Sequence, residues 1–91
     1  MSDKKIMIHR QIGAKIIYYR NLKHMTQAEL AEKVHMSQSS IARIERGKYN
    51  NGASISTLLD IANGLGVNLA SLVTFSEEED RLCMGGDKNF V

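Results

Sequence analysis

Hydrophobic residues recur along the chain at helical spacing, and polar capping residues separate the resulting stretches. Ile12, Ile16 and Tyr19 lie four and three residues apart, which is the spacing of one face of a helix. This spacing predicts a first helix from about Ile8 to Leu22, with its end near His24.

Two capping signals lie close together within residues 26–46, TQAELAEKVHMSQSSIARIER. Thr26 followed three residues later by Glu29 is the pattern of a capping box, and Ser37 provides a second N-cap. The helices predicted behind these caps cover about residues 27–34 and 38–46. Two short helices joined by a tight turn form a helix-turn-helix, which is our prediction for this segment.

The apolar positions of this pair give each helix one buried face. They are Leu30, Ala31 and Val34 in the first helix and Ile41 and Ile44 in the second. The outer face of the second helix then carries Gln38, Ser39, Ala42, Arg43 and Arg46. Glutamine and arginine are side chains suited to base edges in the major groove of DNA.

Two further helices are predicted after Gly47, which suits a helix stop, and a polar loop. Ser54 caps the fourth helix and Gly66 ends it, and Asn68 caps a short fifth helix. The apolar residues of these two helices are Ile55, Leu58, Leu59, Ile61, Ala62, Leu65, Leu69, Leu72 and Val73. The predicted fold class is all-α. Residues 1–75 form the domain, and residues 76–91 form an acidic, flexible tail.

Charge is divided unevenly between the two halves of this 91-residue chain. Residues 1–48 hold ten basic and four acidic side chains, whereas residues 49–91 hold two basic and six acidic ones. The basic half contains the helix pair, which favours a polyanionic partner on that side.

A single cysteine, Cys83, excludes an internal disulfide and fits a reducing compartment. No apolar stretch approaches the roughly 20 residues that a membrane helix needs. The sequence therefore predicts a soluble, cytoplasmic protein with no membrane partner.

From Ile12 to Phe75 the chain resembles the Cro/repressor-type (XRE-like) helix-turn-helix domains. The matching segments are IGAKIIYYR, TQAELAEKV, SQSSIARIERGKYN and SISTLLDIANGLGVNLASL. The resemblance implies a five-helix, lambda-repressor-like domain that binds double-stranded DNA sequence-specifically and regulates transcription, as a repressor. It further implies a homodimer on an inverted repeat, with helix 3 in the major groove.

The resemblance also implies roles for individual residues. The base-reading positions are Gln38, Ser39 and Arg43. The phosphate-contacting positions are Gln27, Ser40, Lys48, Tyr49, Asn50 and Asn51, and Gln27 also braces Gln38. Arg20 and Glu45 match an ion pair between helices 1 and 3 that orients the reading helix.

Two histidines depart from the family pattern, which has glycine at the end of helix 1 and at the turn between helices 2 and 3. His24 and His35 occupy these positions. Glycine is favoured there because the backbone tends toward positive φ, a region in which histidine is also enriched. We therefore expect both histidines to adopt positive φ.

Other functions were weighed against DNA reading. No histidine pairs with another ligand at metal-binding spacing, and the serines are explained by capping, so we expect no metal, no cofactor and no enzyme. A helical domain without a DNA role is one alternative. Another is an antitoxin or other protein-interaction module of a toxin–antitoxin or restriction-modification system, with a partner at the C-terminal region. Candidate dimer-interface residues are Leu69, Leu72, Val73 and Phe75.

Overall fold

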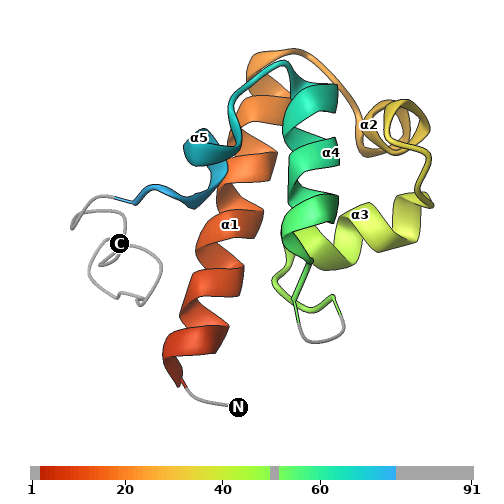
Figure 1. Ribbon diagram of the computed structural model, residues 1–91. Helices are drawn as coiled ribbons and strands as arrows, with labels where there is room; N and C mark the ends of the chain where they lie inside the picture. The colour runs from red at the N-terminus through yellow and green to blue at the C-terminus, as the bar shows by residue number, and fades with distance from the viewer. Residues whose placement is uncertain (1–2, 50–51, 76–91) are drawn as a thin grey trace, which may run out of the picture.

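The computed structural model describes residues 3–49 and 52–75, and these fold into five α-helices (Figure 1). The helices are α1 (Asp3–Leu22), α2 (Gln27–Lys33), α3 (Gln38–Glu45), α4 (Ile55–Leu65) and α5 (Leu69–Val73). The predicted all-α fold class is confirmed. Asn50, Asn51 and the proposed tail at residues 76–91 lie outside the described residues.

Two longer helices, α1 and α4, lie side by side at the centre of the domain (Figure 1). The pair α2 and α3 packs on one side of them, and α5 packs against both α1 and α4. The buried core is aliphatic and draws on every helix: Ile16, Leu30, Ala31, Ile41, Ile44, Leu58, Ile61, Ala62, Leu65 and Leu72.

Side-chain caps begin three of the five helices. The Thr26 hydroxyl accepts a bond from the Glu29 amide at 3.0 Å, and the Glu29 carboxylate accepts one from the Thr26 amide at 2.8 Å. Ser37 and Ser54 each accept a bond from the backbone amide three residues later, at 3.1 Å. These three predicted caps are confirmed. Asn68 occupies the N-cap position of α5, but its side chain makes no capping bond, so that part of the prediction is wrong.

Positive φ angles occur where the sequence predicted them. His24 has φ 56° and His35 has φ 60°, and both lie in the tight connections on either side of α2. Gly47 and Gly66, at the ends of α3 and α4, both have φ 74°. The histidines therefore hold a left-handed conformation that costs less for glycine.

Helix α1 begins at Asp3, five residues before the predicted start at Ile8. The prediction relied on apolar positions that pack on a core, and these first turns extend past the core instead. Ile6 and Ile8 are 40% and 37% exposed. Asp3 in the first turn interacts favourably with the helix dipole.

Candidate nucleic-acid interface

Helices α1 and α3 meet backbone to backbone. Gly13 is buried, and a Cβ atom built on it would clash with the Glu45 carbonyl oxygen and lie 2.7 Å from the Ile44 carbonyl oxygen. No ordinary side chain fits at this position, because the obstructing atoms belong to the α3 backbone. The C-terminal end of α3 is therefore held directly against the middle of α1.

A buried carboxylate joins three helices at the same place. Glu45 is only 6% exposed, and its Oε2 accepts a bond from Arg20 Nε at 2.7 Å. Its Oε1 accepts bonds from Arg20 Nη2 at 3.2 Å and from Gln27 Nε2 at 2.8 Å. Arg20 also donates from Nη1 to the Met25 carbonyl at 2.9 Å. The structure thus contains the Arg20–Glu45 pair expected from the sequence, and the pair ties α3 to α1 and α2.

The opposite side of α3 is exposed to solvent and carries the three residues assigned to base reading. Gln38 is exposed, and its Nε2 lies 3.5 Å from Gln27 Oε1, a long hydrogen bond. The Ser39 hydroxyl lies 3.3 Å from that of Ser37 within the N-cap. Arg43 is exposed and has no ion-pair partner within residues 3–49 and 52–75. Gln38 and Arg43 are therefore available to an external ligand.

The residues assigned to phosphate contact differ in how accessible they are. Lys48 is exposed, whereas Gln27 is half-buried and already bonded to Glu45. Ser40 is half-buried, and its hydroxyl accepts a bond from Ser37 at 2.9 Å. Tyr49 packs partly against the core. Of these four, only Lys48 is exposed, and it is also the only cation.

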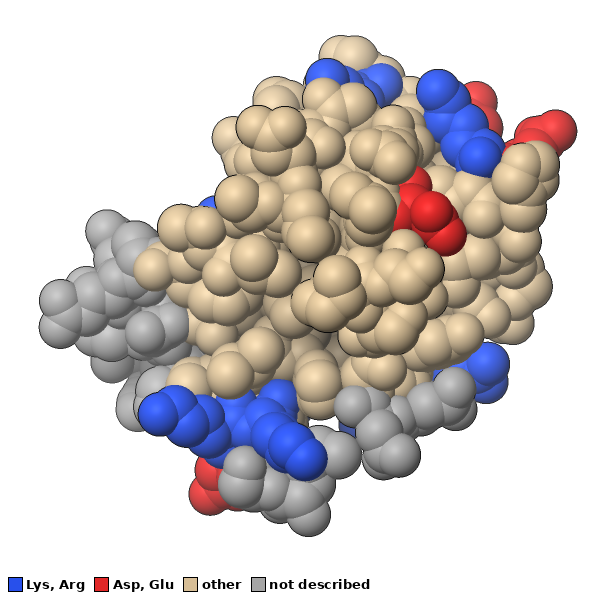
Figure 2. Space-filling view, viewed as in Figure 1, with Lys and Arg blue, Asp and Glu red and all other residues tan. Residues whose placement is uncertain are grey.

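Lysine and arginine side chains gather at the end of the molecule where α1 begins, as Figure 2 shows. A second group lies near α2, at the opposite end, where acidic side chains are mixed with it. The group at the α1 start also has an acidic neighbour, and Asp3 lies in the first turn of α1.

One candidate for the dimer interface is wrong. Leu72 is fully buried in the core of its own protomer, because α5 turns this residue inward against α1 and α4. Val73 is 39% exposed, and Leu69 and Phe75 are half-buried. Two apolar residues of α4 that were not assigned to any site are also exposed, Ile55 at 66% and Leu59 at 45%. Their four-residue spacing was the signal, because it sets them on one helix face beside the buried one.

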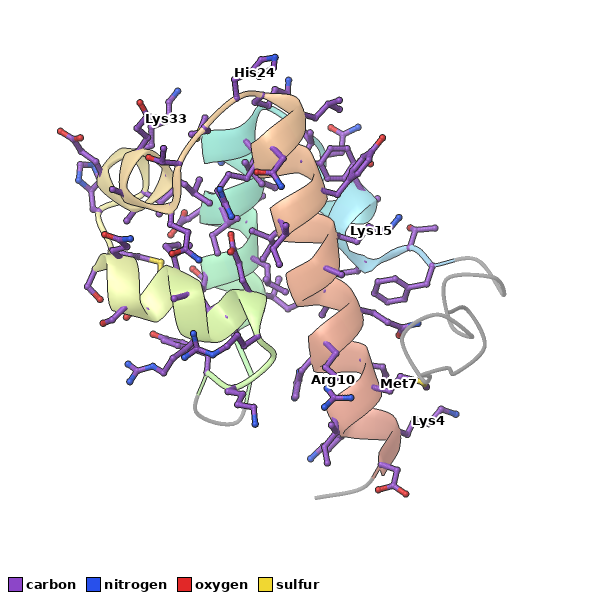
Figure 3. The ribbon with its side chains drawn as sticks, turned by 180° about the vertical axis from the view of Figure 1, so that it is seen from behind. Lys4, Met7, Arg10, Lys15, His24 and Lys33 are labelled. Carbon is purple, nitrogen blue, oxygen red and sulfur yellow. The ribbon has the colours of Figure 1, made fainter. Side chains whose placement is uncertain are left out.

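Within the part of the chain that the structure describes, no three His, Cys, Asp or Glu side chains are grouped to hold a metal ion. His24, labelled in Figure 3, lies at the end of α1 remote from Arg10. No helix among the described residues is long and apolar enough to cross a membrane. A cavity of about 10 Å³ beside His9 has room for one water at most.

A capped helix pair, with the inner side of its second helix locked and the outer side exposed, defines a helix-turn-helix domain. A family model described as helix-turn-helix matches residues 16–72. The chain belongs to this family, the XRE-type helix-turn-helix proteins, whose members are DNA-binding transcriptional regulators rather than enzymes.

Three similar proteins illustrate the relationship. The immunity repressor protein of Bacillus phage phi105 is 40% identical over 62 residues, which are 68% of this chain and only 42% of the repressor. An HTH-type transcriptional regulator of Methanocaldococcus jannaschii is 35% identical over 65 residues, covering 71% of this chain and 96% of that protein. The crystal structure of SinR, a master regulator for biofilm formation, in complex with DNA has a TM-score of 0.63 and 33% identity. That match covers 69% of this chain and 98% of the SinR chain.

Proposed function

We propose that this protein is a transcriptional repressor that reads an inverted repeat as a homodimer, with α3 in the major groove. The observation that carries the proposal is the division of α3 into a locked side and an exposed side. Glu45 fixes the helix through Arg20 and Gln27, while Gln38 and Arg43 face solvent.

The exposed side chains match the chemistry of base edges. The Gln38 amide can bond adenine N6 and N7 together, and the Arg43 guanidinium can bond guanine O6 and N7. Each such two-bond contact is worth about 1–3 kcal/mol of discrimination between bases. Ser39 lies between them in sequence and makes the third base contact of the proposal.

Phosphate contacts would hold the domain in register on the duplex. We assign these to Lys48 and Tyr49 after α3 and to Gln27 and Ser40 at the N-terminal ends of α2 and α3; Asn50 and Asn51 complete the set. If each protomer neutralises about three phosphates, log affinity should fall against log salt with a slope of about −5 for a dimer. Such contacts position the protein without specifying sequence.

A homodimer is supported by the size of the domain and by its remaining apolar surface. A core of so few residues gives a small domain only marginal stability, and dimerisation would bury further apolar surface. Val73 with the outer parts of Leu69 and Phe75 forms the proposed contact, and two reading helices would then lie about 34 Å apart. The phage repressor and the DNA-bound SinR structure, both similar to this chain, support the repressor and DNA-binding parts of the proposal.

Selection of duplexes from a randomised pool tests this function. Wild-type protein should enrich an inverted repeat, and Gln38→Ala/Arg43→Ala protein should enrich none, because both two-bond base contacts are lost. Glu32→Ala/Lys33→Ala protein is the matched control, since both residues are exposed on α2. If folded wild-type protein enriches no sequence, the DNA-reading function is wrong, and a protein partner should be sought instead.

A further inference from the structure

The first turns of α1 are a feature of this chain that the family match does not include. The match begins at residue 16, whereas α1 begins at Asp3. These turns extend past the rest of the helical body at the end where α3 meets α1 (Figure 1). On the first of these turns Ile6 and Ile8 are 40% and 37% exposed, so this part of α1 adds little to the core.

The same turns are held against the loop that follows α3. A Cβ atom on Gly47 would lie 3.0 Å from the Arg10 amide nitrogen and 3.1 Å from the Arg10 Cα and His9 carbonyl carbon atoms. The backbone at Gly47 therefore rests directly on the α1 backbone. This contact fixes the position of Arg10 relative to Arg46 and Lys48, the neighbours of Gly47 in the chain.

Arg10 lies on the side of α1 that faces α3. Gly13 meets α3 directly, and residues three apart in a helix share a face. Lys4 lies nine residues before Gly13, and at 3.6 residues per turn it therefore points to the opposite side. Figure 3 agrees, because Lys4 leaves α1 on the side of Lys15 and α5, away from α3.

Three exposed cations thus lie on two segments whose backbones are in contact at Gly47. Arg10, Arg46 and Lys48 are all exposed, and none makes an ion pair with another described residue. A polyanion held against this part of the surface is attracted by exposed cations from both segments. Arginine is particularly suited to phosphate, because its planar guanidinium can donate two parallel hydrogen bonds.

We propose that Arg10, placed by the additional turns of α1, binds a DNA backbone phosphate beside those held by Arg46 and Lys48. The proposal rests on the DNA-reading function proposed above, which assigned no DNA contact to α1 or to Arg46. It extends the phosphate-contacting surface from the loop after α3 onto the first helix. It concerns affinity and register, because phosphate contacts carry no direct sequence information.

The test compares Arg10→Gln with Lys4→Gln in the full chain. Each variant removes one exposed positive charge from the same end of the same helix, so general charge effects are matched. Equilibrium affinity is measured over a range of salt concentrations, on the duplex selected by wild-type protein and on a random duplex.

Arg10→Gln should reduce the salt slope by about 0.9 for each bound protomer, because one phosphate contact is lost. Its affinity for the selected and random duplexes should fall by the same factor. Arg10→Lys should retain the wild-type slope, and Lys4→Gln should do so as well.

Three results would overturn the inference. Equal slopes for Arg10→Gln and Lys4→Gln, with wild-type protein binding normally, would remove Arg10 from the interface and leave the proposed function intact. A loss confined to the selected duplex would make Arg10 a base contact. A wild-type protein that binds neither duplex would overturn the proposed function together with this extension of it.

Discussion

At a glycine of α1 the neighbouring atoms belong to the α3 backbone, whereas at a glycine of α4 they belong to side chains. At Gly13 the obstructing atoms are carbonyl groups of α3. At Gly64 of α4 the obstructing atoms are the ends of two side chains, Leu30 in α2 and Val34 at its C-cap. A Cβ on Gly64 would lie 2.6 Å from Val34 Cγ1 and 3.3 Å from Leu30 Cδ1.

The two regions also differ in their polar content. The α1–α3 contact includes the buried Glu45, which accepts three hydrogen bonds from Arg20 and Gln27. The buried side of α4 is aliphatic throughout, with Leu58, Ile61, Ala62 and Leu65. Directional bonds and backbone contact fix the angle between two helices, whereas aliphatic packing fills the space between helices and tolerates small shifts of their positions. The region that orients α3 is therefore the one that allows less adjustment.

The largest expected effect is the difference in stability between alanine variants of the two glycines. Gly13→Ala should lower the free energy of unfolding by more than about 3 kcal/mol, because α1 and α3 must move apart. Gly64→Ala should stay within about 1 kcal/mol of wild type, because the gain in helix propensity offsets a shift of the Val34 side chain. Urea unfolding measures both values. Equal losses for the two variants would show that the backbone contact is no stiffer than the side-chain contact.

Loss of the buried carboxylate should have the next largest effect. Glu45→Ala leaves Arg20 without its partner, and we expect a loss of about 3 kcal/mol in the free energy of unfolding. Glu32→Ala, which removes an exposed carboxylate from α2, should change stability by less than about 0.5 kcal/mol. Thermal melting of the two variants checks this. Similar melting temperatures would mean that the Arg20–Glu45 pair does not hold α3 in place.

The smallest effect concerns the turns that flank the two regions. His35→Gly should be neutral or stabilise the protein by up to about 1 kcal/mol, because φ is 60° at this position. Gly66→Ala, at φ 74° after α4, should destabilise it by about 1–2 kcal/mol for the same reason. The difference between the two melting temperatures is the measurement. A clear loss of stability in His35→Gly would indicate that the imidazole makes a stabilising contact.

Helix positions and caps could be predicted because they depend on local chemistry. Thr26 with Glu29, and Ser37 with the α3 amides, form bonds within four residues, so spacing alone indicates them. The positive φ angles of His24 and His35 follow from turn positions that the family resemblance supplied. The Arg20–Glu45 pair also came from that resemblance, since nothing local joins residues 25 positions apart.

Features that depend on three-dimensional packing were missed. The start of α1 at Asp3 was not signalled, because its first turns lack a buried stripe. Leu72 was assigned to the surface because the sequence does not reveal that α5 turns it toward α1 and α4. The role of Gly13 was not predicted either, because a glycine within a helix does not by itself indicate that another backbone passes beside it.

Helices α2 and α3 are short, and their length has a consequence for hydrogen exchange. Helices α2 and α3 contain seven and eight residues, and isolated helices of fewer than about 12–15 residues are marginal in water. The α3 amides are therefore protected only while the helix remains docked on α1. Their exchange should follow opening of the whole domain, at rates shared with the α1 amides around Gly13. The exposed surface of α3 thus has no independent folded existence, and it persists only as long as the core does.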